Sequence, residues 1–256
     1  AGKTTAIRML MDIIRPDTGT IHFDGKIERP HAHQIGYLPE ERGLYQKISV
    51  YETLEYFAQL RNVKDAEIKI KANLDRFDLG DRLDSKVQEL SKGNQQKLQF
   101  INTILHDPQY VVLDEPFSGL DPVNQLVLKE ILEEMKAAGK TIIFSSHQMD
   151  QVEKICDDVA LINKGKLVTS GTLTSIMRNA GHERIQVTPW HAADLKHKYF
   201  HAFTNEIKGD SVFLDLGSKS RQTLIAEINS LIELRSVRIA EPGLEDIFIQ
   251  LVSGVS

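Results

Sequence analysis

Two adjacent carboxylates, Asp114 and Glu115, follow the short apolar run Tyr110 to Leu113. Such a run, rich in β-branched and aromatic residues, predicts a parallel strand that is buried on both faces. Open parallel sheets bind ligands at the carboxyl ends of their strands, and neighbouring strand residues point to opposite faces. We therefore expect different tasks for the two acids: one holds a magnesium ion, directly or through water, and the other orients and deprotonates an attacking water. The alternative is a core strand whose acids only cap the next loop.

A tight loop and a helix are predicted after the two acids. Residues 116–119 supply a proline, a serine and a glycine for the loop. Asp121 is a good N-cap and Pro122 suits a first helical turn, so we expect a helix to about Ala138. Its apolar residues recur at four-residue spacing, at Val123, Val127, Ile131 and Met135.

A second buried strand is predicted after this helix. The run from Thr141 to Ser146 is mostly apolar, and it leads directly to His147. A strand, a crossover helix and a parallel strand form a right-handed unit. This geometry brings His147 to the same edge of the sheet as Glu115.

The start of the sequence resembles half of a phosphate-binding loop. It reads AGKTT, which matches the second half of the motif G-x-x-x-x-G-K-[ST]. Because the first glycine and the preceding strand are missing, we expect the sequence to be a fragment that is cut inside its nucleotide site. Lys3 would contact the β and γ phosphates, Thr4 would contact magnesium, and backbone amides at the helix start would cradle the phosphates. An apolar stripe predicts that this helix continues to Arg15-Pro16, through Ile7, Leu10, Ile13 and Ile14.

A second helix start, at Ser91 and Gly93, could also bind an anion. The simpler interpretation is that Ser91 is only an N-cap. The distinction matters because the chain would otherwise carry two phosphate-binding helix starts. One γ-phosphate needs only one of them unless two subunits share it.

Further elements are predicted before and after this region. Short strands are expected at 21–24 and 35–38, and helices at 50–60 and 66–77. A hairpin about Gly165 and a helix near 173–178 follow the second buried strand. The tail is expected to be a small α+β domain with strands at 185–188, 212–216 and 237–240 and helices near 222–231 and 244–252.

Composition limits the classes of function. The chain has 256 residues and a net charge of −5, with acids and bases spread throughout, which argues against nucleic-acid binding. The segment 181–256 holds eight Lys or Arg against ten Asp or Glu, which also argues against nucleic-acid binding. The single cysteine, Cys156, fits a reducing compartment. We see no secretory leader and no membrane-spanning apolar run, so a role at a membrane would be from the cytosolic side, through partners.

The tail concentrates histidines and the only tryptophan, Trp190. The histidine spacing fits no tight metal motif, so surface or core histidines are favoured over a zinc site. The histidines concerned are His182, His191, His197 and His201.

Six ordered segments resemble the ATP-binding cassette (ABC) family. In chain order they read AGKTT, YLPEERG, LSKGNQQK, YVVLDEP, SGLD and SSH. Each segment alone is weak or moderate, whereas six in this order are very specific. The EERGLY loop and the tail after the cassette look like ATPase subunits of bacterial exporters, the group that includes sodium and drug efflux systems. The resemblance covers about residues 1 to 177.

The resemblance implies a role for each matching residue. Asp114 matches the magnesium carboxylate, Glu115 the general base, and His147 the switch histidine that contacts the γ-phosphate. Ser91 and Gly93 match the signature segment, which in this family completes the ATP site of the opposite subunit. The phosphate loop supplies further nucleotide-binding positions, Gly2, Lys3, Thr4 and Thr5. Glu40 falls in the loop that reports nucleotide state to the membrane subunit. Asp121 matches the loop that crosses between the two sites. Lys3 is expected to act in catalysis with Glu115 and His147, and Thr4 to bind the metal with Asp114.

The sequence departs from the family pattern in three places. Glu40 stands where the family usually has glutamine. Lys92 and Asn94 stand where the commonest signature has glycine and glutamine, although the serine and the second glycine are intact. The missing start removes the first phosphate-loop glycine and the aromatic residue that stacks on adenine, so this piece should bind ATP poorly.

The resemblance implies an α/β fold with a P-loop NTPase-type parallel sheet, an antiparallel β part and a helical signature subdomain at about 45–107. These would form an ABC nucleotide-binding domain over 1–178, followed by a small C-terminal α+β accessory domain over 181–256. The implied function is the ATP-hydrolysing subunit of a bacterial ABC exporter at the cytoplasmic face of the membrane. Its cofactors would be ATP and Mg²⁺. Its partners would be a second copy or a paired ATPase subunit, and an integral membrane permease in which substrate specificity should lie.

Two alternatives to an exporter subunit stay open. A soluble ABC ATPase that acts on ribosomes or DNA would usually show two cassettes or a long inserted coiled coil, and neither is present. A degenerate cassette that only scaffolds a complex is the other alternative. The intact Glu115 and His147 count against it.

Overall fold

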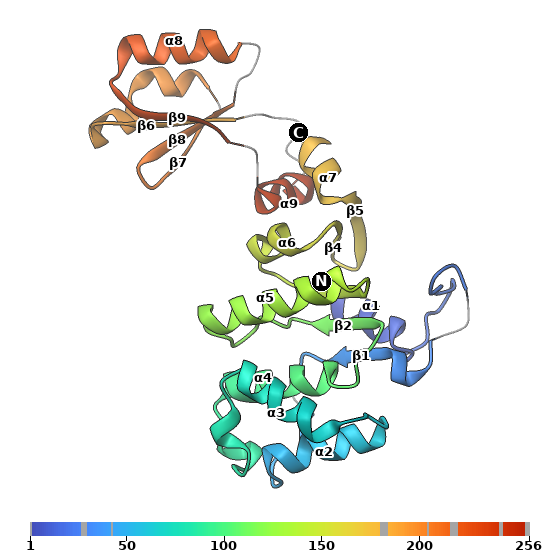
Figure 1. Ribbon diagram of the computed structural model, residues 1–256. Helices are drawn as coiled ribbons and strands as arrows, with labels where there is room; N and C mark the ends of the chain where they lie inside the picture. Colours follow the sequence, from blue (N-terminus) through green and yellow to red (C-terminus); the bar gives the residue numbers. More distant parts are fainter. Residues whose placement is uncertain are drawn as a thin grey trace. The chain divides into compact units, whose positions relative to one another are not determined.

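A computed structural model describes residues 2–26, 30–41, 43–179, 184–203, 205–215, 220–240 and 243–253 (Figure 1). The chain divides into two compact units, Ala1–Gln151 with Lys164–Lys166, and Val152–Asn163 with Leu167–Ser256. The domain boundary expected between residues 178 and 181 stays a prediction. Five positions named in the sequence predictions lie outside the described residues: Ala1, Arg42, Gly181, His182 and Leu216.

The first unit contains a three-stranded parallel sheet in the order β1-β2-β3. Its strands are β1 (Ile35–Leu38), β2 (Tyr110–Asp114) and β3 (Thr141–Ser145). The central strand has buried side chains on both faces, as its continuous apolar run predicts. Asp114 lies opposite Ser145 in the register of β2 and β3. The predicted parallel arrangement is confirmed, but the prediction that the second strand is buried is wrong: in β3 only Ser145 is buried, and Ile143 is 41% exposed.

Helix α1 (Lys3–Leu10) is shorter than its apolar stripe predicts. Asp12 adopts a left-handed conformation with φ 57°. The Ile13 amide donates to Arg8 O at 2.9 Å, and the Asp12 amide donates to Met9 O at 3.0 Å. This pair of bonds is a Schellman motif, which satisfies the last carbonyls and ends a helix. The prediction of a helix to Arg15-Pro16 is therefore wrong, and Ile13 is 56% exposed.

Helix α5 (Pro122–Ala137) begins at the predicted N-cap, since Asp121 accepts a hydrogen bond from the Asn124 amide at 3.0 Å. Its buried face is formed by Leu128, Ile131, Leu132 and Met135. Val123 is 69% exposed, so the predicted stripe at strict four-residue spacing is wrong at its start. The observed spacing of three and four residues follows one face of a helix more closely.

Three helices pack together as a group in the first unit (Figure 1). They are α2 (Val50–Leu60), α3 (Ala66–Arg76) and α4 (Lys92–Ile104). Ser49 and Glu52 form a capping box at the start of α2, and Ser91 caps α4 by accepting from the Asn94 amide at 3.2 Å. Helix α4 also packs closely on β1, because a Cβ atom on Gly36 would lie 2.5 Å from Thr103 O.

The strand expected at 21–24 is a turn instead. Asp24 and Gly25 both have positive φ, 48° and 76°. The amides and carbonyls of Phe23 and Lys26 bond to each other at 2.8 and 2.9 Å, which leaves a single bridge. Left-handed residues at both central positions are typical of a type I′ turn.

The second unit contains two sheets. The first pairs β4 (Asp158–Asn163) with β5 (Lys166–Thr172), and α7 (Leu173–Asn179) follows. The second is antiparallel in the order β7-β8-β6-β9, with α8 (Arg221–Leu231) packed on its buried face. Its strands are β6 (Arg184–Pro189), β7 (Asn205–Lys208), β8 (Ser211–Asp215) and β9 (Leu234–Ala240), and the chain continues to α9 (Leu244–Ser253). The predicted α+β character of the tail agrees with these elements. The strand β7 and the α-helix α6 (Met149–Ile155) were not predicted.

His106 joins the end of α4 to β1, because its Nε2 lies 3.1 Å from Ile35 O. Its Nδ1 is buried and has no hydrogen-bond partner among the described residues. Burial, and then the positive charge of Arg61, lower the pKa of His106 to about 4. The neutral form is therefore the one that the folded protein holds.

We predict that protonation of His106 destabilises the protein in mild acid. A depressed folded-state pKa means that this stability is present above pH 6.5 and is lost as the pH falls toward about 4. His106→Gln keeps a side-chain N–H and cannot titrate, so between pH 7 and 5 it should lose less stability than the wild type, by on the order of 1 kcal/mol. Urea unfolding at several pH values measures this difference. His33→Gln, at an exposed histidine of the same unit, is the control, and an equal effect of both variants would contradict the prediction.

Candidate active site

Asp114 is fully buried at the end of β2. One of its carboxylate oxygens, Oδ1, accepts a hydrogen bond from the Ser145 hydroxyl. The other, Oδ2, is buried without a hydrogen-bond partner among the described residues. A buried carboxylate oxygen is costly to leave unpaired, so Oδ2 is a candidate ligand for a cation. Burial, and then the negative charge of Asp114, also raise the pKa of Tyr37.

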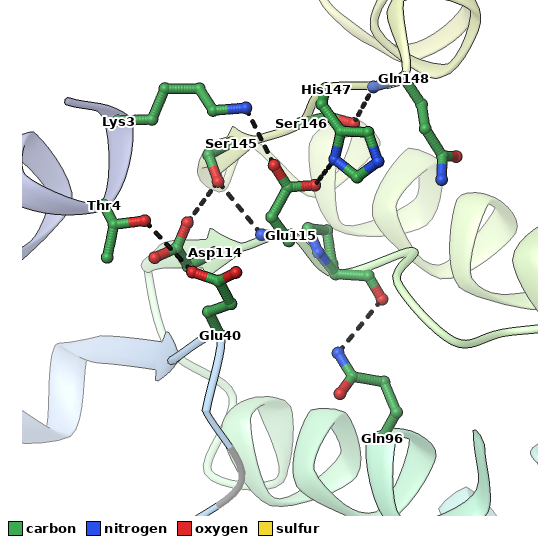
Figure 2. Close-up of polar contacts among 11 residues, drawn as sticks. Lys3, Thr4, Glu40, Gln96, Asp114, Glu115, Ser145, Ser146, His147 and Gln148 are labelled. Carbon is green, nitrogen blue, oxygen red and sulfur yellow. Dashed lines mark hydrogen bonds and ion pairs between the residues drawn. The ribbon is translucent and has the colours of Figure 1, made fainter. Parts of the chain in front are cut away.

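Glu115 follows directly but has different surroundings. Its backbone is left-handed, with φ 52°, and its amide donates to Ser145 Oγ at 3.1 Å and to Ser145 O at 3.2 Å. Its carboxylate is 13% exposed and lies between two basic groups. Lys3 Nζ is 2.9 Å from Oε1, and His147 Nδ1 is 2.8 Å from Oε2 (Figure 2). Because a carboxylate only accepts hydrogen bonds, His147 carries its proton on Nδ1 here.

The start of α1 faces the end of β1 in this site. Gly2 is the N-cap, with a left-handed φ of 105° that glycine adopts without steric cost, and Lys3 and Thr4 open the helix. Thr4 Oγ1 donates to Glu40 Oε2 across a long contact of 3.5 Å. Figure 2 shows the Thr4 and Glu40 side chains pointing toward one another. Thr5 is exposed on the same helix.

The signature residues are held at the start of α4. Ser91 is exposed, and a Cβ atom on Gly93 would lie 3.0 Å from Gly119 O in the loop after Glu115. Hydrogen bonds from Asn124 lower the pKa of Asp121 at the start of α5. In the part of the chain that the structure describes, no hydrogen bond joins Ser91 or Asp121 to the group around Glu115.

Sequence reasoning missed three polar residues that support the site. Ser145 touches both acids, as described above. Gln96 and Gln99 lie on the buried face of α4 and contact two loops. Gln96 Nε2 lies 3.4 Å from Pro116 O in the loop after β2, and Gln99 Nε2 lies 3.3 Å from Glu41 O in the loop after β1. Nothing in the sequence distinguishes these two amides from surface amides, although both residues are 4% exposed in the structure.

The described residues contain no cluster of three or more His, Cys, Asp or Glu side chains that could hold a metal ion. They also contain no helix that is long and apolar enough to cross a membrane.

Two family models match the chain. One, described as "ABC transporter", matches residues 1–118, and the other, described as "ATP-binding protein DrrA1-3-like, C-terminal domain", matches residues 171–252. The uncharacterized ABC transporter ATP-binding protein YhaQ of Bacillus subtilis is 40% identical over 262 residues, which cover 100% of this chain and 87% of YhaQ. The chain belongs to the ABC transporter ATP-binding proteins.

Two further relatives agree with this assignment to the ABC ATPases. Nod factor export ATP-binding protein I of Burkholderia lata is 31% identical over 98% of this chain and 84% of its own length. A solved structure titled "Structure of ATP binding subunit of ABC transporter" matches with a TM-score of 0.65 and 32% identity, over 70% of this chain and 78% of that chain. The predicted family, the α/β fold class and the ATPase class are thereby confirmed.

We predict that the negative charge of Glu40 weakens the binding of ATP. A negative charge beside a triphosphate repels it by on the order of 1 kcal/mol when partly screened, which is about fivefold in affinity. In the full-length protein, Glu40→Gln should therefore tighten ATP binding in the presence of EDTA by about fivefold, as measured by calorimetry. Glu41→Gln removes an exposed acid one residue along and is the matched control. Equal tightening in both variants would show that only net charge matters.

Proposed function

We propose that the chain is the ATP-hydrolysing subunit of a bacterial ABC exporter and that Glu115 is its general base. The observation that carries this proposal is the Glu115 carboxylate, held between Lys3 at 2.9 Å and His147 at 2.8 Å at the carboxyl edge of the parallel sheet. A general base must be fixed within hydrogen-bond reach of the water that it activates. Two basic neighbours on opposite oxygens fix this carboxylate.

Lys3 connects the base to the nucleotide in this proposal. Its ammonium group is a compact charge with three donors, and it lies at the start of α1, where backbone amides also point outward. A triphosphate at this helix start competes with Glu115 for Lys3. Transfer of Lys3 to the phosphates leaves one Glu115 oxygen free to accept a proton from water. His147 holds the other oxygen, and the family pattern assigns it the contact with the γ-phosphate.

The residues at the edge of the sheet fit a magnesium ion. Asp114 Oδ2 is a buried oxygen without a partner among the described residues, and Thr4, at the start of α1, supplies a hydroxyl that reaches Glu40 at the end of β1. Hard oxygen donors of this kind suit Mg²⁺, which in such sites is shared with substrate phosphates. When bound, the ion would neutralise charge that develops on the transferred phosphoryl group. Asp114 and Thr4 would hold it, and Glu40 would lie beside it.

A composite site between two copies accounts for the signature residues. Ser91 and Gly93 open a helix of 13 residues, and Ser91 is exposed. A helix start of this kind favours an anion. Asp121 lies at the start of α5, beside Val123, which is 69% exposed. An exposed apolar residue next to the expected crossing loop supports an interface with a second copy or a paired ATPase subunit.

Export as the direction of transport is supported by two of the comparisons. The name of the Burkholderia lata relative states Nod factor export, and the tail matches the DrrA1-3-like C-terminal domain. An exporter subunit would act with a membrane permease at the cytoplasmic face of the membrane, and the permease would select the substrate. We propose an ABC domain over 1–178 and an accessory domain over 181–256. Co-purification of the full-length protein with a permease from membranes tests this part.

We predict that Glu115→Gln separates ATP binding from hydrolysis. The amide keeps the shape of the side chain and cannot take a proton from water. In the full-length protein, turnover should fall at least about a hundredfold while ATP binding is preserved. Glu133→Gln, at a half-exposed acid of α5 paired with Lys129 at 3.5 Å, is the control. Unchanged turnover in Glu115→Gln would remove Glu115 from the proposed role.

We also predict that two inactive variants restore activity when they share a dimer. Ser91→Asp keeps a good N-cap for α4 but places a negative charge where the partner's triphosphate is expected. In a head-to-tail dimer of Ser91→Asp with Glu115→Gln, one of the two sites is intact. Heterodimers isolated with two different tags should therefore regain about half of the wild-type turnover if the sites act independently.

The reciprocal pairing gives the opposite result. A heterodimer of the wild type with a Ser91→Asp/Glu115→Gln double variant has no intact composite site and should be inactive. If each copy works alone, this pairing would keep half of the activity and the two single variants together would have none. Ser91→Asn, which keeps the cap without the charge, controls for damage to α4.

A further inference from the structure

Ser145 is the last residue of β3, and it is 6% exposed. It lies in register opposite Asp114 in the parallel pair, so the two side chains share one face of the sheet. Its hydroxyl donates to Asp114 Oδ1 and accepts from the Glu115 amide at 3.1 Å (Figure 2). One small side chain therefore touches both acids, one through its carboxylate and the other through its backbone.

The hydrogen bond from Ser145 to Asp114 determines which carboxylate oxygen of Asp114 is available to bind a cation. A serine hydroxyl has a single proton to donate, and here that proton is used on Oδ1. Oδ2 is left buried and without a partner among the described residues. The hydroxyl thus fixes the rotation of the carboxylate, so that Oδ2 is the oxygen available as a cation ligand.

The bond to Glu115 acts on a strained part of the backbone. A non-glycine residue in the left-handed region costs on the order of 1 kcal/mol or more. Ser145 holds the amide of Glu115 from one side, and the Ser118 amide donates to Glu115 O at 3.1 Å from the other. These contacts fix the direction in which the Glu115 side chain leaves the strand.

The next residue along, Ser146, has a different role. Its hydroxyl accepts from the Gln148 amide at 3.0 Å and stabilises the local turn. No hydrogen bond joins it to Asp114 or Glu115 in the part of the chain that the structure describes. The two serines therefore form a matched pair, of which only the first contacts the acids.

We propose that Ser145 is a positioning residue that sets both acids of the site, by presenting Asp114 Oδ2 to the metal and by fixing the backbone of Glu115. The proposal rests on the function proposed above. It adds a residue that acts through two others and that itself touches neither nucleotide nor metal. Residues that orient a metal ligand in this way are worth about 10- to 100-fold in activity or metal affinity.

Steady-state ATP hydrolysis by the full-length protein is the first test. Ser145→Ala should lower kcat about tenfold or more, with less than about a threefold change in the KM for ATP, because the lost contacts act on the reacting groups. Ser145→Thr keeps a hydroxyl and should recover most of the lost kcat. Ser146→Ala should stay within about twofold of the wild type, since the hydroxyl that it loses stabilises only the local turn.

Metal binding gives a second measurement that does not depend on hydrolysis. The melting temperature is measured with ADP and EDTA, and again with ADP and Mn²⁺. Ser145→Ala should keep the rise caused by ADP alone and lose most of the additional rise caused by Mn²⁺, whereas Ser146→Ala should keep both. Should Ser145→Ala fail to fold, Ser145→Cys keeps the volume with a much weaker donor and should show the same losses.

Two results would overturn the proposal. In the first, Ser145→Ala matches Ser146→Ala in both kcat and the Mn²⁺-dependent rise. In the second, Ser145→Thr is as impaired as Ser145→Ala, which would assign the loss to packing and not to the hydroxyl. If Glu115→Gln turned over ATP like the wild type, the proposed base would be wrong, but the Mn²⁺ comparison of the two serines would still decide whether Ser145 sets Asp114.

Discussion

The in-register pairing of β2 with β3 is the constraint on which the rest of the site depends. It places Ser145 opposite Asp114, and the next residues of the two strands, Glu115 and the segment leading to His147, then meet at one edge. Side chains alternate along a strand, so a slip of one residue would turn Asp114 to the other face and separate it from Ser145. Tight burial on both sides of β2 opposes such a slip. The apolar core therefore determines the geometry of the charged groups.

Helix α4 ties this edge to a second part of the unit. Its buried amides reach two backbone carbonyls, Gln96 to Pro116 and Gln99 to Glu41, each in a loop that carries a candidate site residue. Ser91 caps the start of the same helix. A single helix thus carries the exposed Ser91 at its start and contacts both loops through its buried face. Neutral amides suit this task because each can donate in a buried place without carrying a charge.

Much of this arrangement could be predicted from the sequence because strong local signals agreed with one another. The apolar runs at 110–113 and 141–146 predicted two parallel strands, and right-handed crossover geometry brought His147 to Glu115. Capping residues predicted the starts of α4 and α5. The six ordered segments indicated the family, which the comparisons confirm.

The other features of the fold and the site depend on contacts that cannot be predicted from the spacing of apolar residues. The end of α1 is set by a left-handed Asp12, which overrides the apolar pattern that continues beyond it. Ser145 lies inside the predicted strand 141–146, and nothing in the sequence distinguishes a serine that contacts two acids from its neighbour Ser146. Gln96 and Gln99 were similarly indistinguishable from surface amides until burial was known.

The left-handed backbone of Glu115 has a consequence for how this position can vary. Among the described residues, eight non-glycine positions have positive φ, and six of them are Asp or Asn, the types that tolerate this conformation best. Glu115 is one of the two exceptions. An asparagine or glycine there would relax the chain and remove the proposed base in the same step. Selection for a more stable fold and selection for turnover therefore favour different amino acids at this single position.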